Sequence, residues 1–192
     1  MESALAWIGQ IAEWVGRFIP RLVILIPSLG AVRYTGRPFG RGMRVTAHGA
    51  GLHIYWPLVS VWDVYPVVRQ TDDLRTQTIT TADGKTIAAA GLITYEVDDL
   101  LKLLPTTFEP AKAISEITLT ALHDVLSRMT WEDLAQEQRK GTLETKLRNA
   151  AKRQLDDYGV RVIRVQLTDL APARVLKVYQ SISADAALGV SV

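Results

Sequence analysis

The sequence of 192 residues contains no cysteine. Disulfide bonds and thiolate metal sites are therefore excluded, whereas the redox compartment stays open, because a chain without cysteine works in either. An excess charge of one sign is also missing, since 22 Lys and Arg stand against 20 Asp and Glu. This balance argues against nucleic acid as the main partner, which usually requires a concentrated basic face.

A long uncharged apolar run is absent as well. Between Ala4 and Val32 the only charges are Glu13, Arg17 and Arg21, yet no uncharged stretch there reaches the ~20 residues that a spanning helix needs. A secretory signal peptide fits poorly, because Glu2 replaces a basic start and two arginines interrupt the apolar part.

Catalytic motifs are missing too. The chain has no phosphate-binding glycine loop and no nucleophile elbow. None of His48, His53 and His123 has partners at the spacing of a metal site, and the acidic pairs Asp72-Asp73 and Asp98-Asp99 are interpreted as loop and cap residues. We therefore predict a protein that is not an enzyme and that uses no cofactor or metal.

The first thirty residues are rich in apolar side chains. On a helix of 100° per residue, residues 2–19 separate into an apolar and a polar face, with Trp7 and Trp14 on the border, where indole rings prefer to lie in a bilayer. Pro20 ends this helix, and the apolar run 22–26 stops at Pro27. The pattern predicts a monotopic, in-plane or re-entrant anchor over residues 1–30. The predicted membrane-binding residues are Leu5, Trp7, Ile8, Ile11, Trp14, Val15, Phe18, Ile19, Leu22, Ile24, Leu25 and Ile26.

Two readings of this segment remain open. The helix either inserts into a membrane or packs its apolar face on the protein's own core. Its polar face carries two Glu and one Arg, so it gains nothing from anionic lipid, and insertion would rest on apolar area alone.

The middle of the chain predicts strands followed by helices. Residues 76–81 and 86–97 form the clearest hairpin, joined through Asp83-Gly84 in a tight turn, for which we expect type I′. The second strand alternates, with Ile87, Ala89, Gly91, Ile93, Tyr95 and Val97 on one face.

After Asp98 the apolar period changes from two to about 3.6. A helix is predicted from Pro110 to Met129, then a long charged helix capped by Thr130 and ending near Gly159, and finally a strand over 160–167. This order predicts an antiparallel-leaning α+β domain over residues 31–170.

Read in order, these pieces resemble the stomatin/prohibitin/flotillin/HflK-C superfamily, also called SPFH or band 7, over about residues 22 to 180. No single motif is specific, and the match rests on their order and spacing. The motifs are Val32-Arg-Tyr-Thr-Gly-Arg37, Gly51-Leu-His-Ile-Tyr-Trp-Pro57, Arg69-Gln70, Thr81-Ala-Asp-Gly84, Ile93-Thr-Tyr-Glu-Val97, Gly159-Val-Arg-Val162 and Asp169.

The resemblance implies an SPFH/band 7-like sheet with flanking helices, and a membrane-tethered scaffold that forms homo-oligomeric rings or cages. Such a scaffold organises lipid domains and binds membrane proteins such as a protease or channel. The family's long coiled coil is missing here, because residues 171–192 predict only a short helix and tail. We therefore expect oligomerisation through the domain and through Val175, Leu176, Val178, Tyr179 and Ile182, unless these residues cap their own domain.

Taken together, the sequence predicts a peripheral or monotopic membrane protein that acts as a homo-oligomeric scaffold, with lipid, membrane proteins and copies of itself as partners and no nucleic acid. The alternative is a soluble adaptor whose N-terminal helix docks into a groove on a partner protein.

Overall fold

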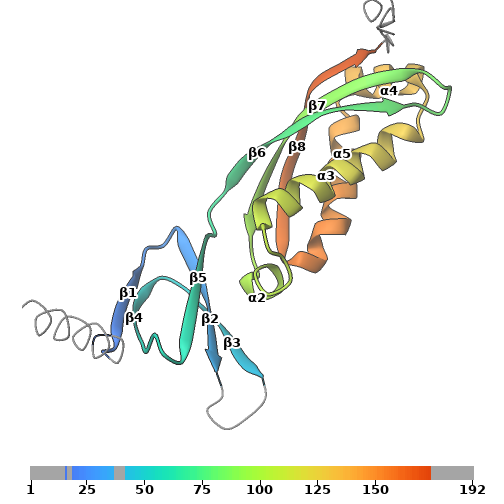
Figure 1. Ribbon diagram of the computed structural model, residues 1–192. Helices are drawn as coiled ribbons and strands as arrows, with labels where there is room; N and C mark the ends of the chain where they lie inside the picture. The colour runs from blue at the N-terminus through green and yellow to red at the C-terminus, as the bar shows by residue number, and fades with distance from the viewer. Residues whose placement is uncertain (1–15, 17–18, 37–41, 174–192) are drawn as a thin grey trace, which may run out of the picture.

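The computed structural model describes residue 16 and residues 19–36 and 42–173, and these form two parts that lie end to end (Figure 1). The first, which we call the small module, runs from Arg21 to Pro66 and contains strands β1 to β5. The second, which we call the body, runs from Gln70 to Pro172 and combines one sheet with the helices. The observed architecture is mixed α+β with antiparallel sheets, as predicted.

The sheet of the body has the order β6-β7-β8, with β6 at Gln70–Thr80, β7 at Thr86–Val97 and β8 at Val160–Pro172. Every second residue of β7 is buried, as the predicted alternation requires. The strand predicted over 160–167 continues to Pro172, because its later residues still pair with the start of β7. Gly91 is required at its place, since a Cβ there would lie 2.5 Å from the carbonyl oxygen of Gln166.

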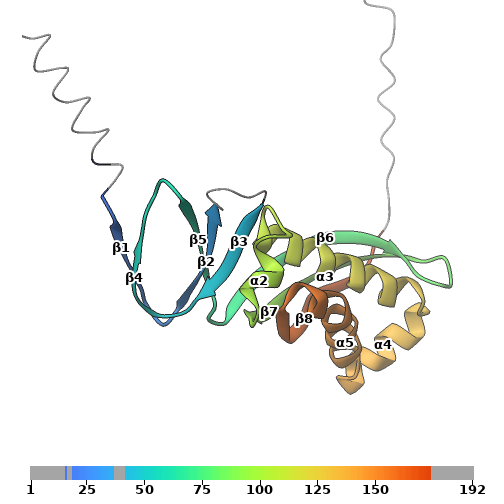
Figure 2. The same cartoon turned by 90° about the horizontal axis from the view of Figure 1, so that it is seen from below.

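The helices cover one face of this sheet (Figures 1 and 2). They are α2 (Leu100–Leu103), α3 (Pro110–Ser127), α4 (Trp131–Lys140) and α5 (Leu143–Leu155), followed by the 3₁₀ turn Asp156–Tyr158. Leu122 of α3 and Leu147 of α5 are both at most 2% exposed and belong to the same core as Ile93 and Val165 of the sheet.

The prediction of one long charged helix after Thr130 was wrong. Gly141 adopts φ 70°, a left-handed conformation that glycine reaches without a Cβ penalty, and it ends α4 before α5 begins. The predicted cap at Thr130 is confirmed, because its hydroxyl accepts the N–H of Asp133 at 3.2 Å.

The β6–β7 hairpin lies where it was predicted, but its turn is not type I′. Asp83 has a negative φ, and only Gly84, at φ 75°, is left-handed. The Thr81 N–H donates to the Lys85 carbonyl at 2.9 Å, and the Gly84 N–H donates to the Thr81 carbonyl at 2.9 Å. The turn is therefore a hairpin loop longer than the two-residue type I′ turn, with glycine at its left-handed position.

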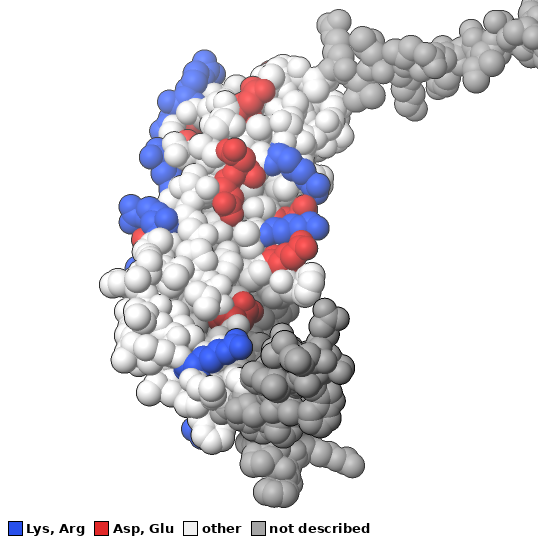
Figure 3. All heavy atoms as spheres, turned by 60° about the vertical axis from the view of Figure 1, so that its left-hand side comes forward, with Lys and Arg blue, Asp and Glu red and all other residues white. Residues whose placement is uncertain are grey.

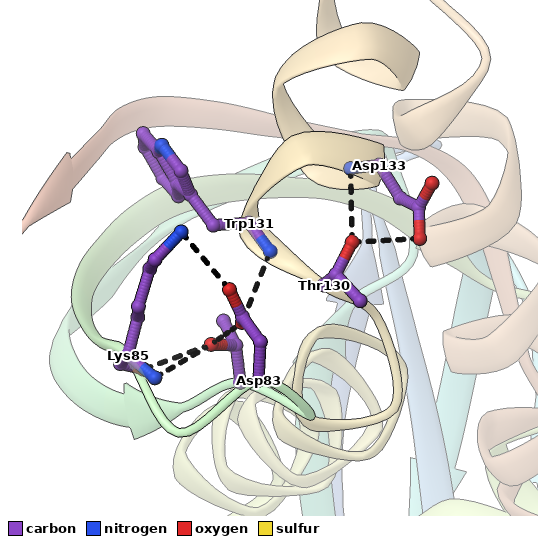
Figure 4. A network of polar contacts seen from close by, with 6 residues as sticks. Asp83, Lys85, Thr130, Trp131 and Asp133 are labelled. Atoms are coloured by element: carbon purple, nitrogen blue, oxygen red, sulfur yellow. Dashed lines mark hydrogen bonds and ion pairs between the residues drawn. The ribbon is translucent and has the colours of Figure 1, made fainter.

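The turn is tied to the start of α4 (Figure 4). The Asp83 carboxylate accepts the hydroxyl of Thr81 at 2.6 Å and the backbone N–H of Trp131 at 3.2 Å, and it pairs with the Lys85 ammonium at 3.1 Å. These contacts, the Thr81 bond above all, lower the pKa of Asp83 to about 2. The Asp-Gly motif is thus a structural joint between hairpin and helix.

The small module contains two sheets. Strands β1 (Arg21–Leu25) and β4 (Gly51–Tyr55) form an antiparallel pair, which we call the ribbon. Strands β3 (Met43–His48), β2 (Leu29–Gly36) and β5 (Ser60–Pro66) form the second sheet in that order. The apolar run 22–26 was interpreted as part of the anchor, but residues 21–25 form strand β1. The sequence could not distinguish the two, because a short apolar run has no period that separates a strand from a membrane-inserted segment.

The two parts meet at α2. A Cβ on Gly30 would lie 2.4 Å from Cδ1 of Leu100 and 2.8 Å from Cγ1 of Val67, so the backbone of β2 touches the body directly. Val32 belongs to the same buried cluster as Leu100. The opposite end of the small module, which we call the tip, holds the start of β1, the start of β3 and the turn between β4 and β5.

Candidate membrane-contacting surface

Exposed apolar side chains gather on the small module. Of fifteen large hydrophobic side chains that are exposed among the described residues, twelve lie between residues 19 and 66. Figure 3 shows the same division, because charged side chains gather over the body while the lower part, over the small module, is mostly uncharged. Scattered exposed hydrophobics are normal on a protein surface, whereas a contiguous group marks an interaction site.

The register of the ribbon explains part of this group. Leu22 lies opposite Ile54, and Ile24 lies opposite Leu52. Because alternate residues of a strand point to opposite faces, these four share the outer face of the ribbon, where each is 56–68% exposed. The ribbon therefore presents a row of aliphatic side chains to its surroundings.

The inner face of the ribbon is more polar than its outer face. His53 and Tyr55 point inward, where their rings lie 5.5 and 5.6 Å from the ring of Trp62 on β5. The ring of His48 lies 4.8 Å from Trp62 and 5.0 Å from His53, and the guanidinium carbon of Arg33 lies 6.0 Å from the Trp62 ring. We call these five residues the histidine cluster.

The ribbon therefore departs from the usual pattern of a half-buried sheet, in which the apolar face is covered and the polar face is wet. The buried Nε of Arg33 and Nε1 of Trp62 have no hydrogen-bond partner among the described residues. Burial, and the nearby charges of His53 and Arg33, lower the pKa of His48.

The tip continues the apolar surface. Its turn exposes Trp56, Leu58 and Val59, and the neighbouring strands add Met43 and Val61. Met43, Leu58, Val59 and Val61 line part of a hollow of about 320 Å³. The Gly36 N–H donates to the Val59 carbonyl at 2.8 Å, which holds the turn against β2.

Another hollow, of about 940 Å³, lies between α3 and α5 and is lined by side chains of both charge signs, such as Asp124, Arg128 and Lys152. Within the described residues, no group of three potential metal ligands is found.

The acidic pairs have structural positions. Asp99 caps α2 by accepting the Leu101 N–H at 2.9 Å, as predicted, whereas Asp72 and Asp73 were wrongly assigned to a loop and lie on β6. Asp72 accepts the hydroxyl of Tyr95 at 2.9 Å, and burial is the first cause of the raised pKa of that tyrosine.

The structure places only part of the predicted membrane-binding set. Ile19, Leu22, Ile24 and Ile26 are exposed, but Leu25 is 4% exposed and belongs to the interior, so it leaves the set. Leu25 points inward because it is one residue removed from Ile24 on the strand. Outside the described residues lie Leu5, Trp7, Ile8, Ile11, Trp14, Val15 and Phe18, as well as Val175, Leu176, Val178, Tyr179 and Ile182.

Sequence reasoning identified a strand over residues 52–56 but missed its pairing with β1 and its exposed apolar face. Leu52, Ile54 and Trp56 alternate with His53 and Tyr55, and this alternation was visible in the sequence. Their exposure follows only from the pairing of β4 with β1, which the sequence does not specify. Among the helices that the structure describes, none is both long and apolar enough to span a bilayer.

Comparison with known proteins agrees with this architecture. The family model described as "SPFH domain / Band 7 family" matches residues 27–187. An uncharacterised protein of the archaeon Archaeoglobus fulgidus is 23% identical over 175 residues, which cover 90% of this chain and 70% of the archaeal protein.

Proposed function

Because the chain belongs to the SPFH domain / Band 7 family, whose members are often membrane-associated scaffolds and generally not enzymes, we propose that it is a membrane-associated homo-oligomeric scaffold. It organises a membrane patch, binds membrane proteins, or both. In this proposal the outer face of the ribbon and the tip contact the bilayer, next to the N-terminal segment.

The observation that supports the proposal most is the exposed apolar outer face of the ribbon. Complete burial of a Leu or Ile side chain is worth about 1.5–3 kcal/mol. Leu22, Ile24, Leu52 and Ile54 are each more than half exposed, so transfer of this surface from water into lipid would contribute about 1 kcal/mol per side chain. The four together would strengthen membrane binding by about three orders of magnitude.

Flotation of the full chain with liposomes tests the proposal. Replacement of Leu22, Ile24, Leu52 and Ile54 by Thr, a polar β-branched residue that suits a strand, should move the protein from the floating to the bottom fraction. The matched control is Phe108→Thr, because this side chain is 97% exposed but lies on the body, before α3.

Three outcomes are distinguishable. Loss of flotation in the ribbon variant alone, with an unchanged circular dichroism spectrum, supports a lipid-facing ribbon. Equal flotation of both variants contradicts it. A wild-type protein that stays at the bottom favours the soluble adaptor.

Assembly is tested separately by mass photometry of the protein in detergent. A discrete large particle supports a ring or cage of many copies, whereas a uniform monomer on a membrane mimic contradicts the ring form of the scaffold.

A further inference from the structure

The small module carries very little negative charge. Its described residues contain Arg21, Arg33 and Arg44 but only one acidic residue, Asp63, which gives a formal balance of 3 − 1 = +2. The body differs, because all eight ion pairs between described residues join side chains from 69 to 164. The cations of the small module are thus not neutralised by neighbours in the way that many body cations are.

Two of these arginines lie at the tip. Arg21 is the first residue of β1 and pairs with Tyr55. Tyr55 directly precedes the turn that exposes Trp56. Arg44 lies on β3 opposite Thr35, beside Met43, which is 61% exposed. Both arginines are exposed, and neither forms an ion pair with a described residue.

Arg33 has a different place. Its guanidinium lies near the Trp62 ring between the two sheets, and its Nε is buried. It is half-buried and packs against Trp62, so it is not counted among the cations of the tip.

We infer that the tip selects anionic lipid, with Arg21 and Arg44 at the headgroups and the adjoining apolar side chains below them. This inference rests on the proposed membrane contact and adds to it a class of lipid. A long arginine side chain can lay its aliphatic stem along apolar surface and keep its charge at the headgroup level. Apolar area alone would not distinguish a neutral from an anionic bilayer, whereas a cation near an anionic leaflet is attracted to it.

Liposome binding of the full chain tests this inference. Binding is measured on vesicles of phosphatidylcholine alone and of phosphatidylcholine with phosphatidylserine, at low and high salt. The test variant is Arg21→Gln/Arg44→Gln. The matched control is Arg128→Gln/Arg148→Gln, which removes the same charge from two exposed positions away from the tip, the C-cap of α3 and the helix α5.

The wild type and the control should bind the anionic vesicles more tightly than the neutral ones, and high salt should reduce the difference. The tip variant should lose about fivefold in affinity per arginine on anionic vesicles, and little on neutral ones. Equal wild-type binding to both vesicles, or equal losses in the two variants, overturns lipid selection by the tip but leaves membrane contact intact. No binding to either vesicle contradicts the proposed function itself.

Discussion

The histidine cluster predicts that the small module loosens in mild acid. His48 and His53 lie between the ribbon and the second sheet, with ring centroids 5.0 Å apart. The strand register places Arg33 and Arg44 on the same face of the second sheet as His48. It places Arg21 on the same face of the ribbon as His53. Neither of these two faces, as the structure describes them, carries an acidic residue. A proton added to the His48 ring therefore finds other cations on these faces and no carboxylate.

The size of this effect follows from Coulomb's law. Two unit charges 5.0 Å apart repel by about 3 kcal/mol at an effective dielectric constant of ~20, and by about 0.8 kcal/mol in bulk water. Both rings are partly exposed, so a value near 1 kcal/mol is the better expectation. The pKa of His48 is lowered in the folded state, mainly by burial. The unfolded module thus binds protons more readily, and its stability is kept at neutral pH and lost as pH falls below about 6.5.

Histidine titration by NMR and hydrogen exchange by mass spectrometry measure this directly. The chain has three histidines, and the third, His123, lies on α3, outside the small module. Protection of the ribbon, corrected for intrinsic exchange rates, should fall between pH 7 and 5 while β7 stays protected. His48→Asn/His53→Asn should remove this dependence, and His123→Asn should not. A His48 that titrates at or above its ordinary pKa, or a ribbon whose protection is independent of pH, refutes the reasoning.

Three further predictions concern the anchor, the hairpin and assembly. Replacing Trp7, Trp14 and Phe18 of the N-terminal segment by Ser should shift the protein to the soluble fraction, since each ring would bury about 150–250 Å² in lipid. Unchanged membrane partition with an unchanged circular dichroism spectrum contradicts the anchor. Gly84→Val should cost about 1–2 kcal/mol and lower the melting temperature, because φ 75° is strained for a β-branched residue, whereas Lys85→Val should not; equal effects contradict the described turn. Truncation after Ala173 should abolish a large oligomer and leave a folded monomer if residues 174–192 mediate assembly, and a protein that no longer folds shows that they cap their own domain.

Much of the body was predictable because its signals are local. The alternation of β7, the cap at Thr130 and the proline start of α3 each depend on residues close together in the chain. Gly141 was overlooked because it interrupts a charged stretch whose apolar period continues on both sides.

The surface of the small module was less accessible to sequence reasoning. The apolar run 22–26 was assigned as a whole to a membrane anchor, but a strand turns alternate residues inward, and Leu25 lies in the interior. The tip depends on segments that are distant in sequence, because Arg21, Arg44 and Trp56 lie at the same end of the small module only through strand pairing. Distant pairing of this kind has no local signal in a single sequence.

The junction between the two parts has a mechanical consequence. The thirteen residues of β8 extend about 40 Å at ~3.3 Å per residue, and this length lies on one side of the contact between Gly30 and Leu100. A force applied across the far end of the body therefore acts on that junction as torque through a long lever arm, while the strands of the tip form a second, shorter arm on the other side. Small tilts of the tip correspond to larger displacements at the hairpin end. A neighbour bound at the hairpin would therefore exert a large torque on the angle at which the tip meets its surroundings.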